Sequence, residues 1–192
     1  MTFSSAPIVS SLRRSLPIET GVMKLVDLDR CYTVSRVPME NGKELVLYAV
    51  HLSAYTSDGV IANEQAEMLL SDMQSEYEKG NYCICGGDFN KDLLGNSEEV
   101  FGISAGDYTW AQPLPEELFR DKNITLVPPL DLENPVPSCR NADAPYHEGQ
   151  YVVTVDGFLV SDNVTVNSAT VIDTGFAYSD HNPVTMTFTL QP

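Results

Sequence analysis

The stretch that decides the fold is "NYCICGGDFN", Asn81–Asn90. "YCIC" is short and fully apolar, which is typical of a buried strand. Two glycines follow it, and glycine allows the backbone to turn tightly. Asp88 and Asn90 then stand two positions apart. The pattern therefore predicts a rigid apolar strand that ends in a tight turn carrying a carboxylate and a carboxamide.

The segments before this stretch predict a hairpin. "CYTVSRV" (Cys31–Val37) and "KELVLYAV" (Lys43–Val50) have the composition and length of strands. The pair Asn41 and Gly42 between them is a strong signal for a tight turn. We therefore expect the two strands to pair in antiparallel fashion.

A helix is predicted between this hairpin and the "YCIC" strand. Ser57 or Asp58 can cap its N-terminus, and apolar residues recur near a period of 3.6 between Ile61 and Tyr77. Gly80 supplies a stop signal at its C-terminus. A strand, a helix and a strand in succession favour a crossover unit, with the helix packed on a sheet.

The remaining segments divide into irregular regions and late strands. We expect residues 1–30 to be irregular, and residues 91–150, rich in Pro, Asn, Asp and Glu, to be mostly loop with one helical turn at Pro115–Phe119. A loop region of this length is usually functional or mobile. Three further strands are expected at Tyr151–Val160, Val164–Ile172 and Pro183–Leu190.

Acidic residues dominate the charge of the chain. Asp and Glu number 27 against 11 Lys and Arg, which gives a formal net charge of −16 over 192 residues. A negative field repels polyanions at long range, and broad nucleic-acid binding needs many cationic phosphate contacts. Long nucleic acid is therefore disfavoured as a partner, whereas a small phosphorylated substrate or a divalent metal is compatible with this charge.

The length of the chain suits one domain with a hydrophobic core.

The cysteines and the apolar stretches give no sign of an exported or membrane protein. Cys31, Cys83, Cys85 and Cys139 form no CxxC pair, and we interpret them as small buried hydrophobic residues rather than a disulfide framework. Reduced cysteines favour the cytoplasm. No stretch is long and apolar enough to span a membrane, and "MTFSSAPIVSSLRRSLPIETG" lacks the hydrophobic region of a signal peptide.

Polar side chains occur repeatedly at the ends of the expected strands. Such groups can converge at one edge of a sheet. Carboxylates and carboxamides are hard oxygen ligands suited to Mg²⁺ or Mn²⁺, and histidine carries protons near neutral pH. Metal-assisted hydrolysis of a phosphate ester uses such a set. The residues are His51 after "LVLYAV", Asp88 and Asn90 after "CICGG", Asp156 within "YVVTVDGFLV", and Asp180 with His181 in "GFAYSDHNPV".

Each of these residues also has a structural explanation. Asp88 after two glycines can be an ordinary turn residue, and His51 can be a histidine of the core. The segment Asp180–Pro183 can be a plain loop before a strand. Asp156 is harder to explain in this way, because a carboxylate buried in an apolar strand is costly unless it is paired or metal-bound.

Taken together, "YAVHLSAY", "GGDFN", "VDGFLVS" and "SDHNPV" resemble the later motifs of the endonuclease/exonuclease/phosphatase superfamily, in the same order. This resemblance implies an α+β class, specifically a DNase I-like four-layer α/β sandwich of two mostly antiparallel mixed sheets with flanking helices. It also implies that residues 31–192 are the C-terminal portion of one such domain, after an irregular segment 1–30. The implied activity is that of a metal-dependent phosphodiesterase or phosphatase.

The resemblance implies a role for three residues of the first two motifs. His51 corresponds to a histidine that contacts the scissile phosphate. Asp88 corresponds to the aspartate that orients or deprotonates the attacking water, and Asn90 to the asparagine that holds the phosphate. Members of the superfamily differ in which group acts as the general base, so that assignment stays open.

The last two motifs imply the metal side of the site. Asp156 corresponds to a carboxylate near the leaving group, either bound to Mg²⁺ or Mn²⁺ or helping to hold the site. Asp180 corresponds to a residue near the metal, and His181 to a residue on the phosphate or the water. Arg140, in the long loop, is a candidate for binding a second phosphate or a headgroup, although a solvated loop arginine is the alternative.

The sequence departs from the superfamily in its first half. We find no early Asn and no metal-binding Glu before His51, since residues 1–30 contain only Glu19, without a strand before it. We therefore expect weak metal affinity, weak or no catalysis by this chain alone, and an exposed inter-sheet face unless a homodimer or a missing N-terminal half covers it. The alternatives are a catalytically incompetent binding or scaffold module, and a zinc hydrolase, which the lack of a Cys/His cluster disfavours.

Overall fold

The computed structural model describes residues 2–18, 28–54, 60–106 and 110–192. Three sequence predictions fall outside these residues. They concern Glu19 and the two proposed helix caps, Ser57 and Asp58.

The centre of the molecule is a sheet of six strands in the order β1-β2-β3-β4-β8-β5. β3 and β4 are parallel, and every other neighbouring pair is antiparallel. The predicted hairpin and the predicted crossover are both confirmed, because β2 pairs with β3 and α1 connects β3 to β4. The strands are β1 Ser10–Ser15, β2 Cys31–Pro38, β3 Glu44–His51, β4 Tyr82–Asp88, β8 Asp156–Ser161 and β5 Ile124–Val127.

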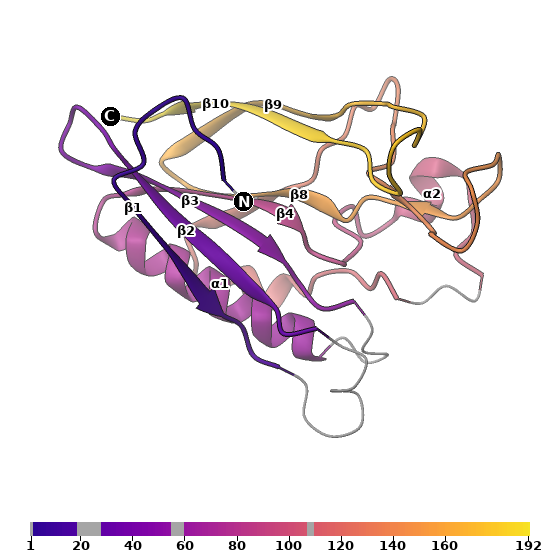
Figure 1. Ribbon diagram of the computed structural model, residues 1–192, viewed down its shortest axis with the longest axis horizontal. Helices are drawn as coiled ribbons and strands as arrows, with labels where there is room; N and C mark the ends of the chain where they lie inside the picture. Colours follow the sequence, from indigo (N-terminus) through magenta and orange to yellow (C-terminus); the bar gives the residue numbers. More distant parts are fainter. Residues whose placement is uncertain (1, 19–27, 55–59, 107–109) are drawn as a thin grey trace.

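Helix α1, Val60–Glu78, covers one face of this sheet (Figure 1). Its buried residues recur at helical spacing and include Leu69, Leu70 and Met73, none more than 1% exposed. They pack against side chains from β2, β3 and β4 that alternate toward the same face. Cys83 and Cys85 belong to this core, as expected, and none of the four cysteines is in a disulfide. The core therefore anchors the strand that leads to Asp88.

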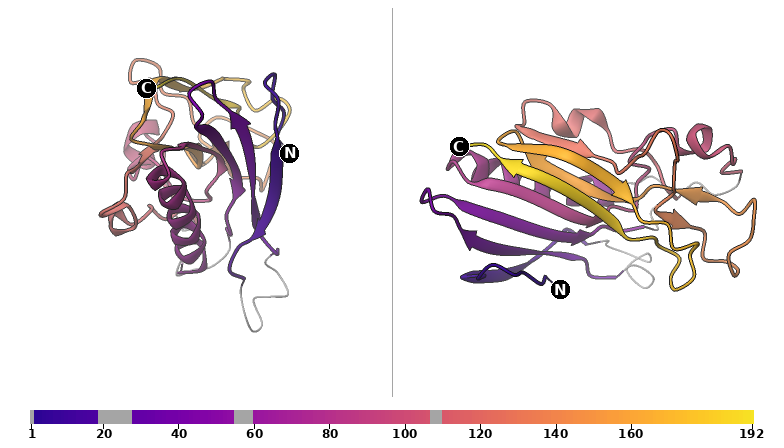
Figure 2. Two further views of the ribbon diagram at one scale, coloured as in Figure 1. Left: turned by 90° about the vertical axis from the view of Figure 1, so that its left-hand side faces the viewer. Right: turned by 90° about the horizontal axis from the view of Figure 1, so that it is seen from above.

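The opposite face of the sheet is covered by a two-stranded antiparallel pair, β9 (Val164–Val171) and β10 (Val184–Leu190). Figure 2 shows this pair and α1 on opposite sides of the central sheet. The inner side chains Val164, Val166, Met186 and Leu190 pack against Tyr82, Ile84 and Val160 of the sheet. The class is therefore α+β, with three described layers. The outer side of the pair is polar, with exposed Thr185 and Thr187.

The structure corrects the expected irregularity of residues 1–30, because Ser10–Ser15 form β1. This strand pairs with β2 over its whole length. All six of its residues are exposed, so no buried apolar alternation marks it in the sequence. Backbone pairing with β2 creates it.

The structure also divides the expected strand Tyr151–Val160 into two. Val152–Val153 form β7, which pairs with β6 (Cys139–Arg140) in a separate sheet, and β8 begins only at Asp156. The break arises because the carbonyls between the two strands accept hydrogen bonds from residues after β4: Thr154 from Leu93 at 2.9 Å and Val155 from Phe89 at 3.0 Å.

The long region 91–150 contains short elements beside its loops. The predicted turn is confirmed as a 3₁₀ helix, η2, at Glu116–Phe119 after Pro115. A short helix, α2 at Ser97–Phe101, was not predicted. Among the described residues, no helix has the length and apolar character needed to cross a membrane.

Candidate active site

Strand register brings three of the sequence-predicted residues into one row. His51 is the partner of Asp88 across β3 and β4, and Asp88 is the partner of Asp156 across β4 and β8. Each strand contributes the polar residue at its end, so the row lies along one edge of the sheet. Strand pairing alone therefore brings these three residues together in space, although they lie far apart in the sequence.

Gly87 allows the strands to approach at this point. A Cβ atom on Gly87 would lie 2.0 Å from the carbonyl oxygen of Val50, a distance that no side chain can accept. A Cβ on the neighbouring Gly86 would meet the Phe158 ring at 3.3 Å. The double glycine thus does more than permit a turn, because it lets β3 and β4 close beside His51 and Asp88.

The chain beyond β4 turns sharply through Asn90, whose φ is 49°. Asparagine tolerates this left-handed conformation better than most residues. Its backbone N–H donates to Asp88 Oδ1 at 2.8 Å, and its side-chain Nδ2 donates to the Leu52 carbonyl at 2.8 Å. The motif therefore fixes the Asp88 carboxylate and ties the ends of β3 and β4 together. Asp88 Oδ2 in turn lies 3.3 Å from His51 Nε2.

His181 enters the site from the loop before β10. Its Nδ1 lies 2.7 Å from Asp156 Oδ2, and its Nε2 lies 3.9 Å from Asp88 Oδ2 and 3.6 Å from Cys139 Sγ. An isolated antiparallel bridge between His181 and Cys139 holds this loop against β6. The Asp156 carboxylate therefore orients the ring so that Nε2 faces Asp88.

These residues surround a cavity of about 430 Å³. Six of the predicted residues line it, and Asp156 lies behind His181 as its hydrogen-bond partner. Arg30, directly before β2, lines the same cavity and was not predicted as a site residue. No motif in the sequence distinguished it from a solvated arginine. The wall comprises His51, Asp88, Asn90, Arg140, Asp180 and His181, together with Leu28, Arg30, Ala54, Trp110, Asn141 and Ala142.

Arg140 is held in place by its own loop. Its Nη1 donates to the carbonyls of Asn141 at 2.9 Å and Ala144 at 2.8 Å. The Gln150 side chain donates to the Asn141 carbonyl at 2.8 Å. The two hydrogen bonds from Nη1 therefore hold the guanidinium in one position at the cavity wall, rather than leaving it mobile in solvent.

The pKa of Asp88, the central residue of the row, is raised. Burial, and then the negative charge of Asp156, raises this pKa to about 6, while the hydrogen bond from the Asn90 amide lowers it. A carboxyl group with such a pKa can exchange a proton near neutral pH.

The two histidines of the site are perturbed in opposite directions. Hydrogen bonding to Asp156, and then contact with Cys139, raises the pKa of His181 to about 11, against the effect of burial. Desolvation, followed by the charges of Arg30 and His181, lowers the pKa of His51 below its ordinary value. At neutral pH the site therefore contains a cationic His181 and a neutral His51.

One group of described residues can hold a divalent cation. Asp88, Asp156 and His181 each offer a ligand atom, and these atoms lie within 4.8 Å of one another. The two carboxylates are oxygen ligands of the kind that Mg²⁺ or Mn²⁺ prefers, whereas the cationic His181 could join them as a ligand only after losing a ring proton. Asp180, expected near the metal, lies at the cavity wall, and its Oδ1 accepts a hydrogen bond from the Ser179 hydroxyl at 3.3 Å.

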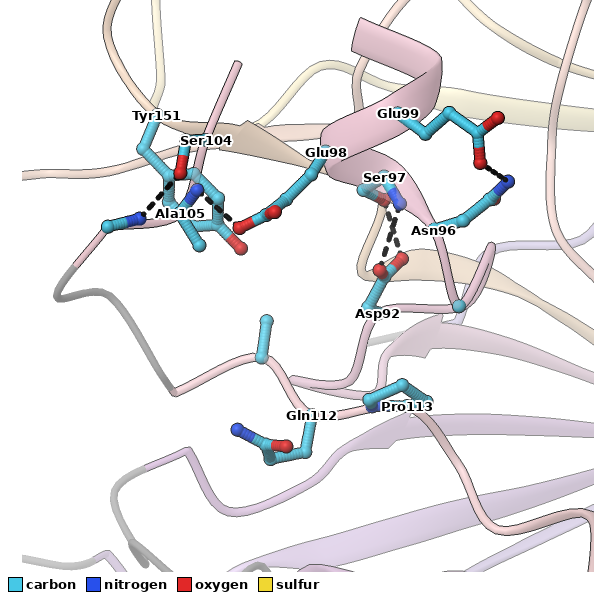
Figure 3. A pocket seen from close by; sticks show the side chains of 13 residues that line it. Asp92, Asn96, Ser97, Glu98, Glu99, Ser104, Ala105, Gln112, Pro113 and Tyr151 are labelled. Atoms are coloured by element: carbon cyan, nitrogen blue, oxygen red, sulfur yellow. Dashed lines mark hydrogen bonds between the residues drawn. The ribbon is translucent and has the colours of Figure 1, made fainter. Parts of the chain in front are cut away.

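A second cavity, of about 690 Å³, lies beside α2 and contains no comparable convergence. Figure 3 shows its acidic side chains turned toward donors of the same loop. Asp92 accepts from Ser97, Glu98 from Ala105, and Glu99 from Asn96. These carboxylates brace the loop around α2, so the smaller cavity is the candidate active site.

Comparisons with solved structures identify the fold. The chain superposes on a mannosyl-6-phosphatase from Bacteroides thetaiotaomicron with a TM-score of 0.59 and 17% identity, over 96% of this chain and 67% of that one. The human Nocturnin catalytic domain gives 0.59 and 20%, over 96% and 60%. ANGEL2, a 2′,3′-cyclic phosphatase, gives 0.61 and 16%, over 97% and 68%.

The fold is thus that of the endonuclease/exonuclease/phosphatase proteins, which confirms the fold that the four motifs implied. The chain spans about two thirds or less of the length of most of these structures. No protein-family model matches the sequence, and no curated protein sequence matches it either.

Proposed function

We propose that this chain carries a phosphoester-hydrolysing site in the cavity formed by the ends of β3, β4 and β8. The observation that carries the proposal is the meeting of His51, Asp88 and Asp156 in one strand register with His181 beside them. Hydrolysis of a phosphate ester needs a positioned water, a proton acceptor and positive charge near the phosphate, and this group supplies all three.

The roles follow from the positions of the side chains. His181, oriented by Asp156, presents Nε2 to the phosphate oxygens. Asp88 orients the attacking water or accepts its proton, while His51 stands 3.3 Å from Asp88 as the alternative acceptor. Asn90 contributes to phosphate binding from the cavity wall.

The cofactor we propose is Mg²⁺ or Mn²⁺. Asp88 and Asp156 would hold it through carboxylate oxygens. Such an ion neutralises negative charge and polarises the phosphorus–oxygen bond. Because the metal-binding Glu of the superfamily has no match before His51, we propose weak metal binding and slow turnover.

The proposed substrate is a small phosphorylated molecule or a lipid headgroup. A cavity of about 430 Å³ suits a ligand of that size, and Arg140 and Arg30 at its wall can bind a second anionic group. The net charge of −16 disfavours long nucleic acid. The name of one structural neighbour, a mannosyl-6-phosphatase, agrees with a small phosphate ester.

An assay with p-nitrophenyl phosphate and bis-(p-nitrophenyl) phosphate in Mg²⁺ or Mn²⁺ tests this function. We expect slow turnover that falls by about 100-fold or more in His181→Gln and in Asp88→Ala, since both changes remove a group that acts on the phosphate or the water. The matched control is His147→Gln, because His147 is exposed and its side chain bonds only the neighbouring Glu148 carbonyl among the contacts described.

Three outcomes would change the conclusion. Turnover that survives both variants would contradict the proposed site. Robust turnover that Asp88→Ala abolishes would confirm the site and contradict the proposal of weak catalysis. A complete absence of turnover would favour the alternative, a binding or scaffold module that retains the fold.

A further inference from the structure

Ser138 connects the two halves of the Asp156–His181 pair. It is fully buried, at 0% exposure. Its hydroxyl donates to Asp156 Oδ2 at 2.9 Å, and this oxygen is the one that lies 2.7 Å from His181 Nδ1. Its backbone carbonyl accepts from the Asn182 N–H at 2.7 Å, one residue after His181. A single residue therefore contacts both the strand that carries the aspartate and the loop that carries the histidine.

The hydroxyl of Ser138 has only one direction in which to donate. It accepts hydrogen bonds from the backbone N–H groups of Val155 and Asp156, each at 3.0 Å. A hydroxyl has two lone pairs and one proton. With two N–H donors on its acceptor side, the proton points to Asp156 Oδ2, which fixes the carboxylate rotamer and keeps its charge-bearing oxygen beside His181.

The loop that carries His181 is tied to the same segment at three more points. The Asn182 side chain donates to the Pro137 carbonyl at 3.0 Å, and Arg140 N–H donates to the Asp180 carbonyl at 3.0 Å. Cys139 lies against His181. The segment 137–140 is therefore a continuous brace along the loop, and Ser138 is the member that reaches the aspartate.

We propose that Ser138 is a positioning residue, which aims the Asp156 carboxylate at His181 Nδ1 and so directs His181 Nε2 into the cavity. It does not contact the cavity itself. The proposal deepens the proposed function, on which its catalytic consequence rests, but the geometry it describes is a property of the folded chain and is testable without turnover.

Proton NMR of the folded chain in water tests the geometry directly. A ring N–H that is hydrogen-bonded to a carboxylate gives a strongly downfield resonance, and His181→Gln identifies the one that belongs to His181. We expect Ser138→Ala to shift or abolish this resonance. The matched control is Ser161→Ala, which removes another fully buried serine hydroxyl, one that accepts from the Cys83 N–H at 2.8 Å and donates to Asn163 at 2.6 Å.

The outcomes separate positioning from general stability. Thermal unfolding should show comparable destabilisation in both serine variants, whereas only Ser138→Ala should change the His181 resonance. An unchanged resonance in folded Ser138→Ala, the same change in Ser161→Ala, or the lack of a His181 resonance in the parent chain would each overturn the proposal.

Kinetics provide the second arm, provided that the parent chain turns over. We expect Ser138→Ala to lower kcat by roughly 10-fold or more, as the loss of an orienting partner does, with KM changed by less than about 2-fold. In the His181→Gln background, Ser138→Ala should not lower kcat any further, because the two residues act as a unit. If the parent chain shows no turnover while Ser138→Ala still changes the His181 resonance, the proposed function is refuted and the positioning role of Ser138 remains supported.

Discussion

At the scale of single residues, Gly87 decides how closely β3 and β4 approach at the site. Its position faces the Val50 carbonyl at a distance that leaves no room for a Cβ atom. The next pair in the register is His51 with Asp88. The spacing of His51 and Asp88 in the candidate site therefore depends on the absence of one methyl group at Gly87.

We expect Gly87→Ala to destabilise the protein by about 3 kcal/mol or more, because overpacking against rigid backbone cannot be relieved by a rotamer change. It should also lower any phosphoesterase activity, since β3 and β4 must separate beside His51 and Asp88. Urea unfolding measures the first effect. Gly86→Ala is the control, because its added Cβ meets only the Phe158 ring at 3.3 Å. Equal destabilisation by the two variants would contradict this account.

At the scale of elements, a buried ion-pair network joins α1 to the sheet. Glu76 of α1 is 3% exposed, and its carboxylate accepts from Arg36 of β2 at 2.7 and 3.0 Å, from Lys79 at 2.7 Å and from Asn81 at 2.8 Å. Burial alone would raise the pKa of Glu76. These hydrogen bonds outweigh burial and lower the pKa from 4.5 to about 2. The network thus stabilises the helix on the sheet only while Glu76 is ionised.

The pH dependence of stability should reveal this network. A carboxyl group whose pKa is lower in the folded state stabilises the fold above its unfolded pKa, and the stabilisation is lost as pH falls through the folded pKa. Between about pH 5 and pH 2, we expect the parent chain to lose roughly 3 kcal/mol more stability than Glu76→Gln does. Urea unfolding across this range measures the difference. Glu67→Gln, at an exposed pair with Lys122, is the control. Parallel pH profiles for Glu76→Gln and the parent chain would refute the assignment.

The elements also differ in how far sequence predicts them. The hairpin, α1 and β4 were predicted because their apolar patterns are local and strong. β1 was not, since all of its residues are exposed and only pairing with β2 makes it a strand. The division between β7 and β8 was not predicted either, because it results from hydrogen bonds with residues 89 and 93, about 60 positions away in the chain. Tertiary contacts thus override local pattern where the backbone bonds elsewhere.

At the scale of the whole molecule, positive side chains line the candidate site of an otherwise acidic protein. The net charge is −16, yet Arg30, Arg140 and His181 share the wall of one cavity with Asp88 and Asp180. An acidic protein attracts divalent cations to its surface in general. Specific binding at the site must therefore be separated from this background.

We expect millimolar Mg²⁺ or Mn²⁺ to raise the melting temperature of the parent chain, because a ligand that binds only the folded state stabilises it by mass action. The shift should disappear in Asp88→Asn combined with Asp156→Asn, which removes both carboxylates of the candidate metal group. Differential scanning fluorimetry at matched ionic strength in NaCl provides the background. An equal shift in the double variant would show that the effect is general screening, and no shift in the parent chain would favour the binding-module alternative.

The sequence by itself determined the class of fold and the candidate residues for the proposed chemistry, because the strand-end motifs at His51, Asp88, Asp156 and His181 are local patterns. Only the tertiary structure decided how they meet. Strand register aligned the first three in one row, and the brace at Ser138 oriented the fourth. The reason is physical: a motif fixes the residue type and the local turn, whereas register, close approach and hydrogen bonds to a distant segment are set by chain contacts that no local pattern contains.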